Sequence, residues 1–270
     1  MTIDAHTLER PEGVEIHWEA RGDGPTVVIA HHSLWSYPGL YHELIVDLAR
    51  DRRVIVYDPR GCGQSSRQGP YDVDTDAADF EAVVEAAGGA ALALSVGEGL
   101  NRTVRVAEAR PDLIPRVLSI VPGAAAVLPQ AELKGAGVMA ASDSVIDMLR
   151  QMMATDPRAA LRMMVGTVNP ELDEVELRER VVRVADYLSP EAALRRAEAW
   201  LADDVIPHAK ALGDRISIAH GGPDPMFEGA LRARVEELLP DARLETLENG
   251  PISRPEITAA RVRELTGAAV

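Results

Sequence analysis

Five side chains that can carry acid–base or nucleophilic chemistry stand close to short apolar runs of this chain: His31, His32, Ser95, Glu98 and Asp224. An imidazole can gain or lose a proton near pH 7, so His32 is a candidate general acid or base, whereas His31 is better explained as a structural histidine that binds nearby backbone. Serine becomes a nucleophile when a base removes its proton. Glu98 is either a general base or a carboxylate that interacts with a helix dipole. The chemistry depends on whether the fold gathers these side chains at one site.

The elements that would position them alternate between strands and helices. Runs rich in Val, Ile and Leu predict strands at 14–19, 26–31, 53–57, 90–94, 116–121, 215–220 and 242–247. Helical spacing predicts helices at 40–50, 76–87, 98–109, 227–239 and 255–266. Nearly continuous apolar strands alternating with helices indicate a parallel sheet covered on both faces. Such sheets bind ligands at the carboxyl ends of their strands.

The segment 124–205 differs, because it contains no strand-like run and shows helical spacing throughout, most clearly at 145–153, 175–188 and 190–201. A helical insert in an α/β chain predicts a cap over the carboxyl edge of the sheet. We therefore expect a core domain formed by 1–123 and 206–270, and a helical cap formed by 124–205.

Four short sequences resemble the α/β-hydrolase superfamily: IAHH at 29–32, YDPRGCGQS at 57–65, SVGEG at 95–99 and AHGGPDP at 219–225. The resemblance implies an α/β-hydrolase fold, with a mostly parallel central sheet flanked by helices and a helical cap insertion. It also implies a nucleophile on a sharp strand-to-helix turn, a later acid and a histidine that follows the acid. In this family His31 and His32 would belong to the loop that supplies oxyanion contacts, and Asp224 would be the acid.

Two alignments of the family's G-x-S-x-G turn compete. In the first, residues 95–99 form the turn and Gly97 stands at the nucleophile position. In the second, residues 93–97 form the turn and Ser95 is the nucleophile. The first alignment leaves a complete strand at 90–94 and starts the helix at Glu98, where the helix dipole favours a carboxylate. We expect Gly97 at the tip of the turn and keep Ser95 as the alternative.

No histidine follows Asp224, since the seven histidines are His6, His17, His31, His32, His42, His208 and His220. The segment where the family has its base reads ENGPISRP at 248–255. Compared with the family, the triad is therefore degenerate, and Asp224 is the member expected to remain. Catalysis would depend on His32, on Glu98 and on backbone oxyanion donors at the turn.

The remaining site predictions concern the pocket walls. The sheet edge is expected to contribute His31, Ser33, Val96 and Gly97. The cap is expected to contribute Met148, Met152 and Trp200, because flexible methionine side chains suit an apolar ligand. The same methionine spacing is also typical of a helical core or a dimer contact. Asn101 and Arg102 are expected on the helix surface or behind the site.

Composition excludes several classes of partner. The 270 residues include 28 basic and 43 acidic side chains, and the net charge of −15 argues against nucleic acids and anionic membranes. One cysteine, Cys62, excludes an intrachain disulfide and agrees with a cytoplasmic location. The sequence has no metal-ligand cluster, phosphate loop or dinucleotide fingerprint, so neither a metal nor a cofactor is expected.

Three functions remain open for a chain of this kind. The first is a non-hydrolytic enzyme, a lyase, isomerase or cyclase, that uses acid–base and oxyanion chemistry on an apolar carbonyl-bearing molecule. The second is an inactive pseudo-hydrolase that binds or senses a hydrophobic ligand. The third is an esterase-type hydrolase that uses Ser95 with an unusual base. The family often forms dimers, so a homodimer is also considered.

Overall fold

An eight-stranded sheet forms the centre of the molecule in the order β1-β2-β4-β3-β5-β6-β7-β8. The computed structural model describes residues 2–34, 36–120, 132, 143–169, 172–221, 230–247, 252 and 254–267. The strands are β1 (Ile3–Arg10), β2 (Val14–Arg21), β3 (Thr26–Ala30), β4 (Arg53–Tyr57), β5 (Leu92–Val96), β6 (Val117–Ile120), β7 (Ile216–Gly221) and β8 (Arg243–Leu247). β1 and β2 are antiparallel to their neighbours, whereas β4, β3, β5, β6, β7 and β8 are parallel. Their carboxyl ends therefore meet at one edge.

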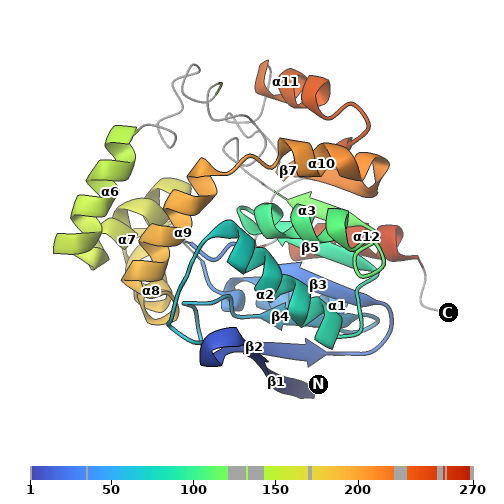
Figure 1. The fold of residues 1–270 in the computed structure, drawn as a ribbon, viewed down its shortest axis with the longest axis horizontal. Helices are drawn as coiled ribbons and strands as arrows, with labels where there is room; N and C mark the ends of the chain where they lie inside the picture. Colours follow the sequence, from blue (N-terminus) through green and yellow to red (C-terminus); the bar gives the residue numbers. More distant parts are fainter. Residues whose placement is uncertain are drawn as a thin grey trace.

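Helices cover both faces of this sheet, as the sequence predicts (Figure 1). The helices are α1 (His42–Leu48), α2 (Val73–Ala86), α3 (Gly99–Ala109), α6 (Asp143–Thr155), α7 (Pro157–Val168), α8 (Glu174–Tyr187), α9 (Pro190–Ala202), α10 (Ile206–Leu212), α11 (Ala230–Leu238) and α12 (Pro255–Thr266). The 3-10 turns are η1 (Pro11–Gly13), η2 (Pro38–Tyr41) and η4 (Gly213–Arg215). Side chains of α2, α3 and α10 share one apolar core with the sheet, and those of α1 and α12 share a second.

Helices α6 to α9, called the helical group below, lie together on the left of the view in Figure 1, to one side of the sheet. They enclose an apolar core of their own, which includes Leu149, Leu161 and Val184. Leu34 and Tyr71 of the sheet-bearing part also contribute to this core. The division into a core domain and a cap stays a prediction. No helix within the described ranges is long and apolar enough to cross a membrane.

Two differences from the sequence predictions affect the site or the sheet edge. β1 was not expected, because most of its side chains are exposed and only its pairing with β2 holds it in the sheet. The strand predicted at 90–94 is wrong by two residues, since β5 runs from Leu92 to Val96. Ser95 pairs with Ser119 of β6 and continues the sheet, although both alignments of the turn include Ser95.

Candidate active site

The turn between β5 and α3 centres on Gly97. Its φ is +57°, in the left-handed region that glycine adopts without strain. The Gly97 N–H donates to the carbonyl oxygen of Ile120 at 3.3 Å, which fixes the turn to β6. Ser95 lies within β5, is fully buried, and its Oγ has no hydrogen-bond partner among the described residues. The residue at the tip of this turn is therefore Gly97, and Ser95 is inside the sheet.

Close packing at Gly99 brings the end of β3 against the start of α3. A Cβ at position 99 would lie 2.0 Å from the carbonyl oxygen of Ala30, so only glycine allows this approach. Glu98 is the N-cap residue, and α3 starts one residue later than the sequence predicts. The loop after Ala30, which begins with His31 and His32, consequently lies beside Gly97 and Glu98.

The imidazole of His32 fills the space over Gly97. A Cβ built at position 97 would lie 2.7 Å from His32 Nδ1 and 3.0 Å from its Cγ. Nδ1 also lies 2.7 Å from Glu98 Oε2. The Nε2 atom makes no hydrogen bond to any residue that the structure describes, and 19% of the side chain is exposed. A histidine ring thus stands where the side chain of a residue at the turn would otherwise project.

Hydrogen-bond donors surround the carboxylate of Glu98, which is only 4% exposed. The backbone N–H of Ser33 donates to Oε1 and Oε2 at 3.0 and 3.2 Å, and the Ser33 hydroxyl makes a short hydrogen bond to Oε1. Arg102 Nη1, one helical turn along α3, lies 3.5 Å from Oε1. Because its oxygens already accept this many hydrogen bonds, the carboxylate is suited to holding His32 and poorly placed to act as a base itself.

The charge state of Glu98 decides which nitrogen of His32 carries the proton. Burial would raise the pKa of Glu98, but the positive charges of His32 and Arg102, the hydrogen bond from His32 and the charge of Arg196 outweigh it and hold the pKa well below its usual range. An ionised carboxylate can only accept, so Nδ1 of His32 must be the donor. In the neutral ring, Nε2 then carries the lone pair that can take a proton.

Two buried arginines and a second carboxylate complete this cluster. Arg102 and Arg196 both bind Asp76 Oδ2, at 3.1 and 3.0 Å. Arg102 Nη2 also donates to the carbonyl oxygen of His31 at 2.5 Å. Of the two predicted places for Arg102, the helix surface is excluded because the side chain is completely buried, and the residue lies behind the site against Glu98. Its position four residues after Glu98, one turn along the same helix face, is the signal that could have revealed the pairing.

His31 has the structural role that its sequence context suggests. It is completely buried, and burial lowers its pKa, so the ring is neutral at pH 7. Nδ1 lies 2.9 Å from the carbonyl oxygen of His32, and Nε2 lies 3.1 Å from the hydroxyl of Tyr187. Nε2 also lies 3.2 Å from the carbonyl oxygen of Tyr57. A neutral ring has one N–H, so when Nδ1 donates to His32, Nε2 accepts from the Tyr187 hydroxyl and makes no hydrogen bond to the Tyr57 carbonyl. His31 therefore fixes the backbone from which His32 projects.

Comparisons with known proteins agree with this architecture. The family model for the alpha/beta hydrolase fold matches residues 26–98. The chain is similar to the enol-lactonase of Burkholderia xenovorans LB400 (20% identity, TM-score 0.73, covering 94% of this chain and 97% of that one). It is also similar to a bromoperoxidase from Bacillus anthracis (22% identity, TM-score 0.76, covering 97% of both chains). The chain has the α/β-hydrolase fold.

Both structures are at most 22% identical to this chain in sequence, so these matches establish its fold and no closer relationship. A shorter match joins 28% of this chain to 14% of the "Probable oxidoreductase EphD" of Mycobacterium tuberculosis, with 38% identity over 88 residues. The chain thus spans only a small part of that curated relative. The comparisons show the fold, and the substrate of this chain has to be argued from its own residues.

The other predicted wall residues of this α/β-hydrolase-fold chain are more scattered. Val96 packs in the apolar core beneath α1 and α12, and Met148 on α6 is 41% exposed. Met152 packs against the core of the helical group, as helical methionines commonly do. Trp200 on α9 lines a cavity of about 20 Å³ that Glu98 also lines. Asp224 lies outside the described residues.

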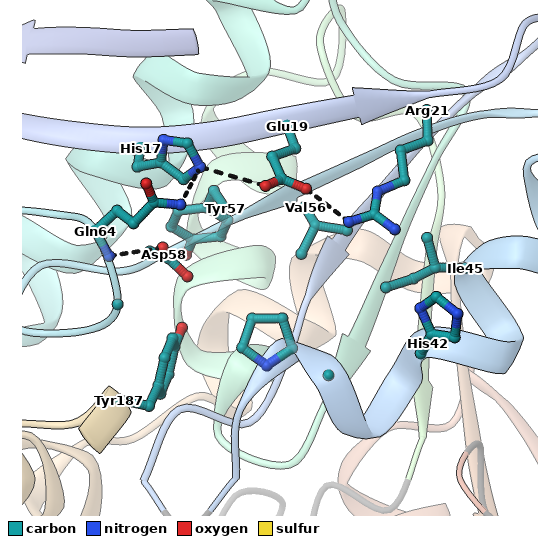
Figure 2. A pocket seen from close by; sticks show the side chains of 13 residues that line it. His17, Glu19, Arg21, His42, Ile45, Val56, Tyr57, Asp58, Gln64 and Tyr187 are labelled. Atoms are coloured by element: carbon teal, nitrogen blue, oxygen red, sulfur yellow. Dashed lines mark hydrogen bonds and ion pairs between the residues drawn. The ribbon is translucent and has the colours of Figure 1, made fainter. Parts of the chain in front are cut away.

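A larger pocket of about 300 Å³ lies behind His31, between β2, α1 and the end of β4. Figure 2 shows His17, Glu19 and Arg21 of β2 along one wall, linked by hydrogen bonds and ion pairs. Tyr187, which binds His31, stands at one end of this pocket. His32 and Glu98 are not among the residues that line this pocket. The sequence did not predict the pocket, because the polar side chains that alternate along β2 are those of an ordinary strand with one solvent-facing side.

Other reactive groups are poorly suited to catalysis. Burial raises the pKa of the Cys62 thiol to about 12, so it remains protonated and a weak nucleophile. Within the described ranges, no group of three His, Cys, Asp or Glu side chains is arranged to hold a metal ion. The pair formed by His32 and Glu98 remains the candidate site.

Proposed function

We propose that this chain is an enzyme that moves protons on a small, apolar, carbonyl-bearing molecule without forming a covalent acyl-enzyme. The observation that carries the proposal is the His32 imidazole, which fills the space over Gly97 and is held at Nδ1 by Glu98, 2.7 Å away. In this role Nε2 takes a proton from the substrate as a general base and returns it as a general acid. Glu98 orients the ring and stabilises the imidazolium that forms.

The lack of a side chain at position 97 favours lyase, isomerase or cyclase chemistry over covalent hydrolysis. A covalent intermediate of the usual kind needs a nucleophile at the turn, and Gly97 supplies none. No histidine follows Asp224 in the sequence, so in this proposal the family's triad is degenerate. The helical group would serve as the cap, within the segment 124–205, and the substrate would enter between it and the sheet edge.

Hydrolysis through Ser95 is the alternative that this arrangement supports least. Ser95 is completely buried within β5, and its hydroxyl has no hydrogen-bond partner among the described residues. Without a base to remove its proton, a serine hydroxyl at neutral pH is a poor nucleophile.

A binding protein without catalysis is the second candidate. Gly97 at the turn favours a binding protein as much as it favours a non-covalent enzyme, because neither function needs a nucleophile. Thermal-shift screening with small apolar ketones, followed by mass spectrometry of the recovered ligand, separates the two. A ligand that stabilises the protein and returns unchanged supports binding, and a ligand that returns altered supports the enzyme.

Fluorophosphonate labelling tests the central step of the proposal. We expect no adduct on the wild-type protein by intact mass, and p-nitrophenyl acetate turnover that is the same in wild type and Ser95→Ala. A wild-type adduct that Ser95→Ala abolishes would overturn the proposal. It would establish a serine hydrolase whose base has to be sought at His31 or His32.

A further inference from the structure

An arginine of the helical group reaches the carboxylate that holds His32. Arg196 lies on the buried face of α9, among the small side chains of Ala192, Ala193 and Ala197, and is 5% exposed. Its Nη2 binds Asp76 of α2 at 3.0 Å and lies 3.9 Å from Glu98 Oε1. A charged side chain on an otherwise apolar helix face needs a buried partner, and here that partner belongs to the sheet-bearing part of the molecule.

A chain of hydrogen bonds continues from Arg196 to His32. Arg196 Nε donates to Ser33 Oγ at 3.2 Å, and this hydroxyl donates to Glu98 Oε1. Glu98 in turn accepts from His32 Nδ1. Because Arg196 occupies a lone pair of the Ser33 oxygen, the hydroxyl hydrogen is left to point at the carboxylate. The orientation of Ser33, and through it that of Glu98, depends on a side chain from α9.

While the His32 ring is neutral, the charges of the other four groups in the cluster balance only when Arg196 is present. Arg102 and Arg196 face Asp76 and Glu98, so two guanidinium groups oppose two carboxylates. Removing Arg196 leaves the buried Glu98 and the half-buried Asp76 with a single guanidinium, an arrangement that favours protonation of one of the two carboxylates. The neutral titratable groups around Glu98 are His31, Tyr41, Tyr57 and Cys62.

We propose that Arg196 is a positioning residue for the pair formed by His32 and Glu98, and that this pair is complete only while α9 is docked on α2 and α3. The effect of Arg196 on catalysis rests on the proposed function, whereas its effect on the hydrogen bond between His32 and Glu98 does not. Asp203, at the end of α9, adds a second attachment, since it accepts from Arg105 at 2.6 Å and from Asn101 at 2.6 Å. When the helical group is docked, Arg196 would therefore keep Glu98 ionised, and undocking would remove this positive charge from the carboxylate.

Proton NMR of the His32 Nδ1–H tests this coupling without any substrate. A hydrogen bond to a buried carboxylate shifts such a proton to low field and slows its exchange, and loss of the signal in His32→Gln assigns it. In the wild type the signal should persist on acidification for as long as Glu98 stays ionised. In Arg196→Met it should disappear at a pH higher by about one unit or more, because Glu98 loses a neighbouring positive charge.

Two further variants separate positioning from folding. Arg195→Met removes the adjacent arginine of α9, whose side chain is 63% exposed, and should leave the titration of the signal unchanged. Arg196→Lys keeps the charge and should restore most of the wild-type behaviour. Circular dichroism at each pH value confirms that the compared samples are folded.

Ser33→Ala tests the hydrogen-bond chain itself. In Ser33→Ala, as in Arg196→Met, the signal should disappear at a higher pH than in the wild type. In the double variant this pH should rise by less than the sum of the two single increases. An Arg196→Met protein that is folded and titrates like the wild type would overturn the inference. Because the signal is independent of turnover, failure of the proposed catalysis would appear separately, as activity that does not depend on His32.

Discussion

At the scale of single residues, Gly97 and His32 are complementary. The glycine leaves a space at the tip of the turn, and the imidazole occupies it. Neither feature alone indicates function, because glycines are common in turns and histidines are common in loops. Together with Glu98, which lies 2.7 Å from one ring nitrogen, they form the pair that we propose as a base at the turn between β5 and α3. The proposed function therefore depends on the pair formed by His32 and Glu98.

Gly97→Ser tests this complementarity. The new side chain would occupy left-handed backbone, which costs about 1–2 kcal/mol, and would collide with the His32 ring. We expect Gly97→Ser to lower the free energy of unfolding by more than that strain alone, measured by urea denaturation. The matched control is Gly88→Ser, which also has a positive φ but open space around it. Equal losses in the two variants would mean that the ring does not fill the site.

At the scale of elements, the site depends on how closely α3 begins against β3. Gly99 allows this approach, and it brings two segments that are 66 positions apart in sequence into hydrogen-bond contact. The parallel sheet supplies the rest, since β3 and β5 are neighbours with their carboxyl ends at the same edge. The position of His32 beside Glu98 thus follows from strand order and one small residue.

Gly99→Ala is expected to separate these elements. Its Cβ would lie 2.0 Å from the Ala30 carbonyl oxygen, so the backbone must shift, at a cost of about 1–3 kcal/mol. Gly166→Ala in α7 provides a contrast, because its Cβ would meet Leu177 at an ordinary 3.5 Å and alanine favours helix by about 0.5–1 kcal/mol. Thermal unfolding of the two variants should shift in opposite directions. A stabilised Gly99→Ala would contradict the close packing described here.

Sequence reasoning predicts the site only in part. The apolar runs at 26–31 and 53–57 identify strands that end close to where the structure ends them, and Gly97 at the turn follows from its spacing. Arg196 could not be paired with Glu98, because they are far apart in sequence and no local pattern joins them. The start of β5 was misplaced because small alanine residues are compatible with both loop and strand.

At the scale of the whole molecule, buried carboxylates make stability depend on pH. The folded-state pKa of Glu98 lies below its unfolded value near 4.5, so its contribution is present above about pH 4.5 and is lost as the pH falls toward the folded value. Asp51, which binds Arg263 of α12, also has a lowered pKa and contributes with the same sign. The protein should therefore lose stability on acidification.

Glu98→Gln isolates the largest of these contributions. At pH 7 the substitution leaves the two buried arginines, Arg102 and Arg196, with Asp76 as their shared carboxylate partner, and it should cost about 3–5 kcal/mol of unfolding free energy. The difference from the wild type should shrink as the pH falls from 7 to 3.5, because Glu98 becomes protonated when the wild-type protein unfolds. Glu85→Gln, at a site that is 63% exposed, is the control and should show little pH-dependent difference. A difference that is constant with pH would contradict an ionised, stabilising Glu98.

The measurement that tests the account most directly is the rate at which the protein removes a proton from 5-nitrobenzisoxazole, a small apolar molecule that a general base opens to a coloured phenol. If His32 is the base, His32→Gln should lower the rate by about 100-fold or more, while Ser95→Ala should retain the wild-type rate. Circular dichroism would establish that both variants are folded. A wild-type rate no greater than that of His32→Gln would contradict the assignment of His32 as the catalytic base.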